Sequence, residues 1–287
     1  MINVRRILHV LRRPPRGPLI ATIGLSEIPP GEIVYAIGDL HGMDTLLAQL
    51  LAMIMKDIGP TDQHVNLVIL GDLIDRGPAS AGVIDALLER ASPKTEKFSL
   101  VVLKGNHEDM FLSFMENPEA TGAHWLSMGG DATLASYGVQ CPKRPTRREL
   151  RRLRDKLRLH MPRAHVDFLS ALPLTFSRGD YFFCHAGARD GVPLDRQRED
   201  DLLWIRAGFA DRDAAFEKIV VHGHTPVPAP ELRRHRINID TGAYATGRLT
   251  AVKLHGRSCD FLEAVSPVSS RTPRVPGETI RTMESNK

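Results

Sequence analysis

The sequence of 287 residues has few cysteines and no long hydrophobic run. Cys141, Cys184 and Cys259 are an odd number, far apart and without CxxC spacing, which argues against a disulfide framework and a zinc ribbon. No apolar run approaches the ~20 residues of a transmembrane helix. The start of the chain also lacks the continuous apolar core of a secretory signal. We therefore expect a cytoplasmic protein without a transmembrane segment.

The whole chain has a net charge of +4, but this charge is unevenly distributed. Acidic residues are scarce in two basic segments. Lys143 to Arg158 contains nine basic and two acidic residues, a net charge of +7. The first 16 residues contain five arginines and no acidic residue. The remainder of the chain therefore has a net charge of −8, which suits a site that holds cations.

The composition, 42% hydrophobic and 25% charged, is typical of a globular protein with one catalytic domain and short flanking segments. We expect a basic N-terminal arm over residues 1–30 and a catalytic domain over 31–264. Residues 265–287, rich in Ser, Thr, Pro and charge, are expected to form a disordered tail.

The basic segment 143–160 is predicted to contain a helix from Arg147 to His160. Its leucines lie on one side at helical spacing: Leu150, Leu153 and Leu157. One interpretation is a solvated helix that packs through these leucines. The other is that 143–158 attracts nucleic acid or an acidic protein.

Short apolar runs alternate with helical patterns from Gly31 onward, which predicts an α/β fold. Residues Met43 to Ile54 repeat apolar side chains at the spacing of an amphipathic helix, and a second helix is expected after Pro78. Each strand and helix together take about thirty residues, the size of a βαβ unit, so the first strands should be parallel. The predicted strands are 33–37, 67–70, 100–103, 181–184, 218–221, 237–239 and 249–254.

Polar side chains follow five of these apolar runs. Ligands of parallel sheets gather at the carboxyl ends of the strands, so these side chains should lie together. The segments that follow the runs are Gly38-Asp39-Leu40-His41-Gly42, Gly71-Asp72-Leu73-Ile74-Asp75-Arg76-Gly77, Gly105-Asn106-His107-Glu108, His185-Ala186-Gly187 and His222-Gly223-His224-Thr225. Carboxylate, imidazole and amide oxygen are ligands for divalent Mn, Fe, Zn or Co. Each motif alone is weak, but five in one register predict a metal centre.

These five blocks, in this order, resemble the PPP family of metallophosphoesterases, specifically its bacterial and phage branch of serine/threonine protein phosphatases. The resemblance covers Ile33 to about Leu254. It implies a calcineurin-like four-layer sandwich of two mixed β-sheets flanked by helices, with two divalent metal ions, Mn or else Fe or Zn, at one edge. Carried over by motif, Asp39 and His41 hold one metal, Asp72 bridges both, and Asn106, His185 and His224 hold the other.

The same resemblance implies how the enzyme works on phosphoserine, phosphothreonine or phosphotyrosine in a protein substrate. A hydroxide that bridges the metals attacks phosphorus directly. His107 is the expected general acid, and Asp75 hydrogen-bonds its imidazole. Arg76, and by a looser match Arg206, should bind the phosphoryl oxygens.

Two other functions remain open. A sister branch with similar blocks hydrolyses dinucleoside polyphosphates symmetrically, but it usually lacks the Asp-Arg pair and has Asp where this chain has Glu108. A nucleic-acid-binding or non-catalytic module would have lost a ligand or the acid, and none is lost. We also interpret His222 as a neighbour of the ligands, and Cys184 as a buried core residue.

Overall fold

The computed structural model describes residues 24–91, 97–209 and 215–266. Residues 1–23 of the predicted basic arm (1–30) lie outside the described residues. Residues 267–287 of the predicted tail (265–287) also lie outside them. Within the described part of the arm, Ile28 is buried and donates its backbone N–H to the Gly256 carbonyl. Packing against the body therefore begins before Gly31.

The first sheet has five strands in the order β10-β9-β1-β2-β3. The parallel strands β1 (Glu32–Ile37), β2 (His64–Ile69) and β3 (Phe98–Val102) form one half, as the sequence predicts. Strand β9 (Arg248–His255) pairs antiparallel with β1, and β10 (Ser258–Val265) pairs antiparallel with β9. Strand β10 was not predicted, because most of its side chains are only partly buried and give no continuous apolar run.

The second sheet also has five strands, in the order β4-β5-β6-β8-β7. Its parallel centre consists of β5 (Tyr181–Cys184), β6 (Ile219–His222) and β8 (Arg236–Asn238). The antiparallel edges are β4 (Thr175–Arg178) and β7 (Glu231–Leu232). Both sheets are therefore mixed, as predicted.

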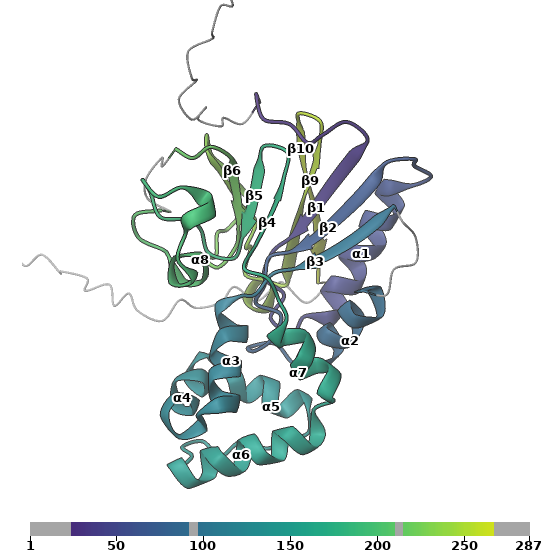
Figure 1. The fold of residues 1–287 in the computed structure, drawn as a ribbon. Helices are drawn as coiled ribbons and strands as arrows, with labels where there is room; N and C mark the ends of the chain where they lie inside the picture. The colour runs from purple at the N-terminus through teal and green to yellow at the C-terminus, as the bar shows by residue number, and fades with distance from the viewer. Residues whose placement is uncertain (1–23, 92–96, 210–214, 267–287) are drawn as a thin grey trace, which may run out of the picture.

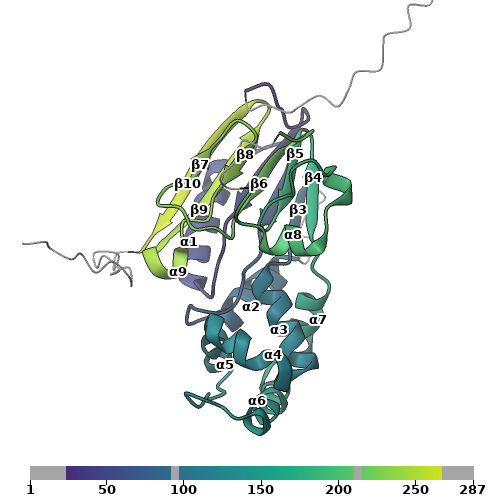
Figure 2. The same cartoon turned by 90° about the vertical axis from the view of Figure 1, so that its left-hand side faces the viewer.

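The two sheets pack face to face and helices cover the outer faces (Figures 1 and 2). Alternate side chains of β1 divide between two cores, with Val34 and Ala36 between the sheets and Tyr35 and Ile37 toward the helices. Helices α1 (Asp44–Ile58) and α2 (Ser80–Ala91) cover the first sheet. The second sheet is covered by a 3₁₀ turn, η2 (Leu194–Arg196), and the short α8 (Glu199–Trp204). The four-layer prediction is confirmed, with a thin fourth layer.

A group of helices between β3 and β4 projects below the sheets (Figure 1). It comprises α3 (Asn106–Glu116), α4 (Pro118–Trp125), the π turn η1 (Leu126–Gly130), α5 (Asp131–Ser136), α6 (Arg147–His160) and α7 (Arg163–Ser170). Helix α6 has the predicted bounds, begins at a capping box between Thr146 and Glu149, and buries its three leucines. A last short helix, α9 (Ala243–Thr246), precedes β9.

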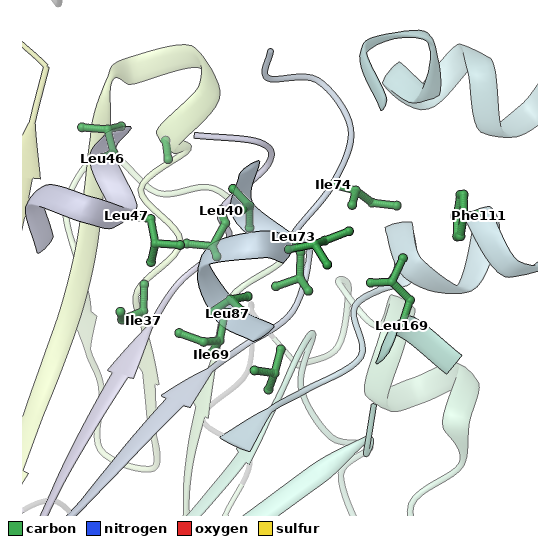
Figure 3. Close-up of a cluster of buried hydrophobic side chains, with 14 of the residues drawn as sticks. Ile37, Leu40, Leu46, Leu47, Ile69, Leu73, Ile74, Leu87, Phe111 and Leu169 are labelled. Carbon is green, nitrogen blue, oxygen red and sulfur yellow. The ribbon is translucent and has the colours of Figure 1, made fainter. Parts of the chain in front are cut away.

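Apolar side chains anchor the loops that carry the predicted ligands. Leu40, Leu73 and Ile74 have no exposed surface, and they lie in the core that joins the first sheet to the projecting helices (Figure 3). This burial fixes the loop backbone between Asp39 and His41 and directly after Asp72. Within the described part of the chain, no helix has the length and apolar character to cross a bilayer.

Candidate metal centre

The six predicted ligands meet at the carboxyl edge of the two sheets. They follow five strand ends, and at most 4% of any of them is exposed. They are Asp39 and His41 after β1, Asp72 after β2, Asn106 after β3, His185 after β5 and His224 after β6. The sandwich therefore brings together residues that are 185 positions apart.

Backbone strain in the described residues gathers at this edge. Five non-glycine residues have positive φ there: His41, Asp72, Asp75, Arg76 and His224. Such conformations cost about 1–3 kcal/mol each and persist only where surrounding contacts enforce them. Their concentration in one site indicates that function, and not stability, selects these loop conformations.

One group of potential ligand atoms combines Asp72, Asn106, His185 and His224. The Oδ1 atom of Asn106 lies 2.9 Å from both His185 Nε2 and His224 Nδ1, and Asp72 Oδ1 lies 3.3 Å from His185 Nε2. The Leu70 carbonyl accepts a hydrogen bond from His185 Nδ1 at 2.9 Å, which leaves a lone pair on Nε2. Lone pairs and acceptor oxygens that converge in this way fit a cation.

A second group combines His41, Asp72 and His107, whose nearest ligand atoms lie within 4.8 Å of one another. His41 Nδ1 donates to the Ile74 carbonyl at 2.9 Å, and this directs Nε2 to Asp72 Oδ2 at 3.3 Å. The two carboxylate oxygens of Asp72 thus face different histidines. His107 is hydrogen-bonded through Nδ1 to Asp75 and is not needed as a ligand, so the remaining donors fit two divalent metals that share Asp72.

Asp39 lies beside these groups but belongs to neither of the two triads that the described residues form. Its carboxylate accepts the backbone N–H of His224 at 3.2 Å. Gly223 permits this approach, because a Cβ there would lie 2.1 Å from Asp39 Oδ1. Burial and the neighbouring Asp240 raise the pKa of Asp39 well above its usual value. The role of Asp39 as a ligand stays a prediction.

Burial keeps His41, His185 and His224 neutral, which is the form that binds metal. It lowers the pKa of His41 to about 3 and that of His224 to about 2. The pKa of His185 is also lowered, first by burial. Burial alone would raise the pKa of Asp72, but protonated imidazole around it, including that of His107 whose own pKa is raised, outweighs burial and holds the pKa of Asp72 below its usual range.

His107 is bound to a buried carboxylate, as predicted. Its Nδ1 lies 2.7 Å from Asp75 Oδ2, and Asp75 has no exposed surface. Trp125 Nε1 and Thr133 Oγ1 also donate to Asp75, at 2.9 and 2.6 Å. Burial lowers the pKa of His107, but the carboxylates of Asp72 and Asp75 outweigh burial and raise it.

Arg76 lies across the metal groups. Its guanidinium donates to His41 Nε2 at 2.7 Å and to His107 Nε2 at 2.8 Å. The ring of Tyr244 lies under it, 4.9 Å away, and packs edge-on against His41. Arg76 itself is held at positive φ by a hydrogen bond from its N–H to the Gly129 carbonyl. A guanidinium in this position can bind the oxygens of a phosphoryl group beside the metals.

Arg206 is exposed and follows α8. Its charge contributes to lowering the pKa of His185 and His224, so it lies near the site, although no described side chain forms a hydrogen bond or ion pair with it. Neighbouring Trp204 packs edge-on against His224 with ring centres 6.3 Å apart. The structure therefore places Arg206 at the rim of the site.

Glu108 is the main site residue whose role sequence reasoning missed. Its carboxylate accepts backbone N–H groups of Asp72 at 2.9 Å, Leu73 at 2.8 Å and Gly105 at 2.8 Å. A Cβ on Gly105 would lie 2.3 Å from the Asp72 backbone nitrogen, so this packing requires glycine. The Gly-Asn-His-Glu sequence contains Glu108, but no local pattern indicates that its carboxylate accepts backbone N–H groups of the loop after β2.

Two other predictions concern neighbouring residues. His222 packs against Phe209 with ring centres 4.9 Å apart, and its Nε2 lies 3.3 Å from the Arg236 guanidinium, as expected for a neighbour of the ligands. Cys184 is fully buried, and burial holds the pKa of its thiol well above the usual value, as expected for a core residue. Asp240 lies beside the site and accepts the Gly242 N–H at 2.9 Å.

Comparison with known proteins identifies similar chains. The sequence model of the calcineurin-like phosphoesterases matches residues 33–255. The asymmetrical bis(5'-nucleosyl)-tetraphosphatase PrpE of Bacillus thuringiensis strain Al Hakam is 29% identical over 262 residues, which cover 84% of this chain and 95% of that protein. PrpE of Anoxybacillus flavithermus strain WK1 is 27% identical over 238 residues, covering 76% and 88%.

Solved structures share the fold. A candidate diadenosine tetraphosphatase has a TM-score of 0.54 at 21% identity and covers 85% of this chain and 98% of its own. A protein serine/threonine phosphatase from Saccharomyces cerevisiae has a TM-score of 0.51 at 14% identity, covering 86% and 82%. These identities are low, so the likeness concerns the sandwich and not the substrate.

Proposed function

The chain belongs to the calcineurin-like phosphoesterases, and we propose that it hydrolyses phosphate monoesters on protein side chains, with phosphoserine and phosphothreonine as its substrates. The hydrogen bond of 2.7 Å between His107 and the buried carboxylate of Asp75 carries the proposal. The pair places an imidazole that can donate a proton in the site, and the serine alkoxide that leaves from phosphoserine needs such a donor.

The residues around the site have separate tasks. Asp72, His41, Asn106, His185 and His224, with Asp39, would hold two divalent metal ions. When bound, these ions supply an activated water nucleophile and neutralise charge on the phosphoryl oxygens. Arg76 and Arg206 orient the phosphoryl group.

With the Arg76 N–H groups on the phosphoryl oxygens and no longer on His107 Nε2, that nitrogen can carry the proton that it gives to the leaving oxygen, and Asp75 stabilises the imidazolium that precedes this transfer. An alkoxide from serine is strongly basic and needs that proton. A phosphate leaving group from a polyphosphate is weakly basic and departs without it. The His107–Asp75 pair therefore favours a phosphate monoester as the substrate.

The second candidate is asymmetrical hydrolysis of dinucleoside tetraphosphates. The names of the Bacillus relatives support it, at 29% identity over 84% of the chain. The sister branch named in the sequence analysis cleaves its substrate symmetrically, whereas the Bacillus relatives are named as asymmetrical enzymes. The expected products of this second candidate therefore differ. Two unequal nucleotides would form, in place of two equal ones.

The test offers three substrates in parallel to chelator-stripped protein that has been reloaded with Mn²⁺: a phosphoserine peptide, a phosphotyrosine peptide and diadenosine tetraphosphate. Phosphate release from the phosphoserine peptide at the highest kcat/KM is the expected result. Faster cleavage of the dinucleotide, with no release from either peptide, would overturn the proposal in favour of the second candidate.

A further inference from the structure

Helix α6 presents a row of cations to solvent. Arg148, Arg152 and Lys156 are all exposed and follow one another at intervals of four residues, so they lie along one line of the helix. None of the three forms an ion pair with a described residue. The carboxylate of Glu149 caps the helix by accepting the Thr146 backbone N–H at 2.7 Å, and the charge of Arg152 acts on it without forming an ion pair. Like charges at this spacing destabilise a helix, so packing does not explain them.

An apolar side chain ends this row. Leu159 follows Lys156 by three residues on the same side of α6, and it is 84% exposed. The row from Arg148 to Leu159 is about 17 Å long at 1.5 Å per residue. An extended peptide of about five residues spans that length.

We propose that this α6 row, Arg148, Arg152, Lys156 and Leu159, docks an acidic segment of the protein substrate, a role that depends on the proposed phosphatase function. Three cations match three or four carboxylates, and Leu159 offers a contact for one apolar side chain. Outside the two basic segments the chain has a net charge of −8 and repels an acidic segment, so among the described residues α6 is its favourable place.

Nucleic acid fits the row less well. The exposed aromatic side chains among the described residues, Trp204 and Tyr244, lie at the metal centre and not on α6, so bases have no stacking surface there. A long polyanion would also extend beyond this short row onto the acidic body. A short peptide segment avoids both problems.

The structure also sets the distance between docking and catalysis. Arg158 of α6 donates to the Met115 carbonyl at 3.0 Å, and Met115 lies nine residues along α3 from Asn106. The α6 backbone therefore lies about 14 Å from the metal centre along α3, and its outer face is about one helix diameter, ~10 Å, farther. An extended linker of about eight residues covers that path.

The experiment uses the full chain and synthetic phosphoserine peptides. One carries a tract of Glu residues with a Leu, joined to the phosphoserine by ten residues, and the others have a two-residue linker or Gln in place of Glu. The variant is Arg148→Gln/Arg152→Gln/Lys156→Gln. The matched control, Lys56→Gln/Arg196→Gln/Arg234→Gln, removes three exposed positive charges elsewhere.

The expected result is a KM about tenfold lower for the long-linker acidic peptide than for the Gln peptide. A factor of about ten is the gain in affinity that three exposed ion pairs together provide. The α6 variant should remove this advantage without changing kcat or the hydrolysis of p-nitrophenyl phosphate, and the control should keep it. Equal loss in both triple variants, or no advantage for the acidic peptide, would overturn the docking site.

Binding of the unphosphorylated acidic peptide, followed by fluorescence anisotropy, separates docking from catalysis. Loss of this binding in the α6 variant alone supports the docking row even if no peptide is dephosphorylated, an outcome in which only the proposed function fails. A single-stranded oligonucleotide of equal charge that binds more tightly through the same residues would overturn the assignment to a peptide.

Discussion

At the scale of single residues, Asp75 has the most demanding surroundings in the site. It is fully buried, at positive φ, and accepts hydrogen bonds from His107, Trp125 and Thr133. Burial raises its pKa, and these three donors oppose that shift. A buried carboxylate with three donors holds one imidazole in one orientation, which a proton donor requires.

The Asp75→Asn substitution should shift the pH dependence of the reaction. The carboxylate of Asp75 helps to raise the pKa of His107, and the acid acts only while it is protonated. Activity on an alkyl phosphate therefore falls as pH rises through that pKa, and removal of the negative charge moves this fall to lower pH. A profile of kcat/KM against pH checks it. Thr133→Val, which keeps the charge, should shift the profile less, and equal profiles for all three proteins would exclude this role of Asp75.

The Asp72→Asn substitution should weaken both metal sites together. One oxygen of Asp72 lies 3.3 Å from His185 and the other lies 3.3 Å from His41, so one side chain serves both groups. Elemental analysis after dialysis against Mn²⁺ should show less than one equivalent, whereas Asp39→Asn should keep about one. Two full equivalents in Asp72→Asn would contradict the shared carboxylate.

At the scale of elements, the loops that follow the strands can position ligands because neighbouring elements hold their backbone in place. Leu73 and Ile74 anchor the loop after β2 in the core, and Glu108 at the start of α3 holds the backbone of the same loop. Helix α3 thus supplies Asn106, His107 and the carboxylate that positions Asp72. The loop after β2 and the first turn of α3 form one unit.

Glu108→Gln should loosen this unit. A carboxamide places an N–H₂ group against backbone N–H donors, so at least one of them loses its acceptor. The free energy of unfolding should fall by about 2 kcal/mol, measured by urea denaturation in the presence of a chelator. Mn²⁺ affinity should fall as well. The control Glu119→Gln removes an exposed ion pair with Arg151 and should change stability by less than about 0.5 kcal/mol. Similar stability of the two variants would contradict the proposed role of the Glu108 carboxylate in holding the loop after β2.

The sequence predicted the central elements better than the edges. The strands β1, β5 and β6 are buried nearly throughout and therefore appear as apolar runs. The edge strands β4 and β7 are partly exposed and short, so their residues show no such run. Pairing with a neighbouring strand, and not local composition, makes them strands.

At the scale of the whole molecule, the ligands were predictable because each lies a few residues after a strand that appears in the sequence as an apolar run. The contacts that support them were not. Trp125 and Thr133 reach Asp75 from 50 and 58 positions away, on the helices that project below the sheets. Their positions depend on how those helices pack, for which the chain has no local signal. The predicted arm and tail, the partners and the metal identity stay predictions.

Metal binding should stabilise the whole fold, since its ligands come from both sheets. At a Mn²⁺ concentration 100 times the dissociation constant, one site adds about 2.7 kcal/mol, which raises Tm by about 5 to 10 °C. Differential scanning calorimetry of chelator-stripped protein with and without Mn²⁺ checks it, and Asp72→Asn should show a much smaller rise. An unchanged Tm for the unmodified protein would mean that the two groups do not bind this ion.

The central claim is that the site expels an alkoxide with the help of His107. Its most direct test compares the unmodified protein and His107→Ala, both loaded with Mn²⁺, on a phosphoserine peptide and on p-nitrophenyl phosphate, whose leaving group departs without a proton. We predict that His107→Ala keeps its metal and loses about 10² to 10⁴ in kcat on the peptide, with a much smaller loss on the aryl ester. An equal loss on both substrates would contradict the account.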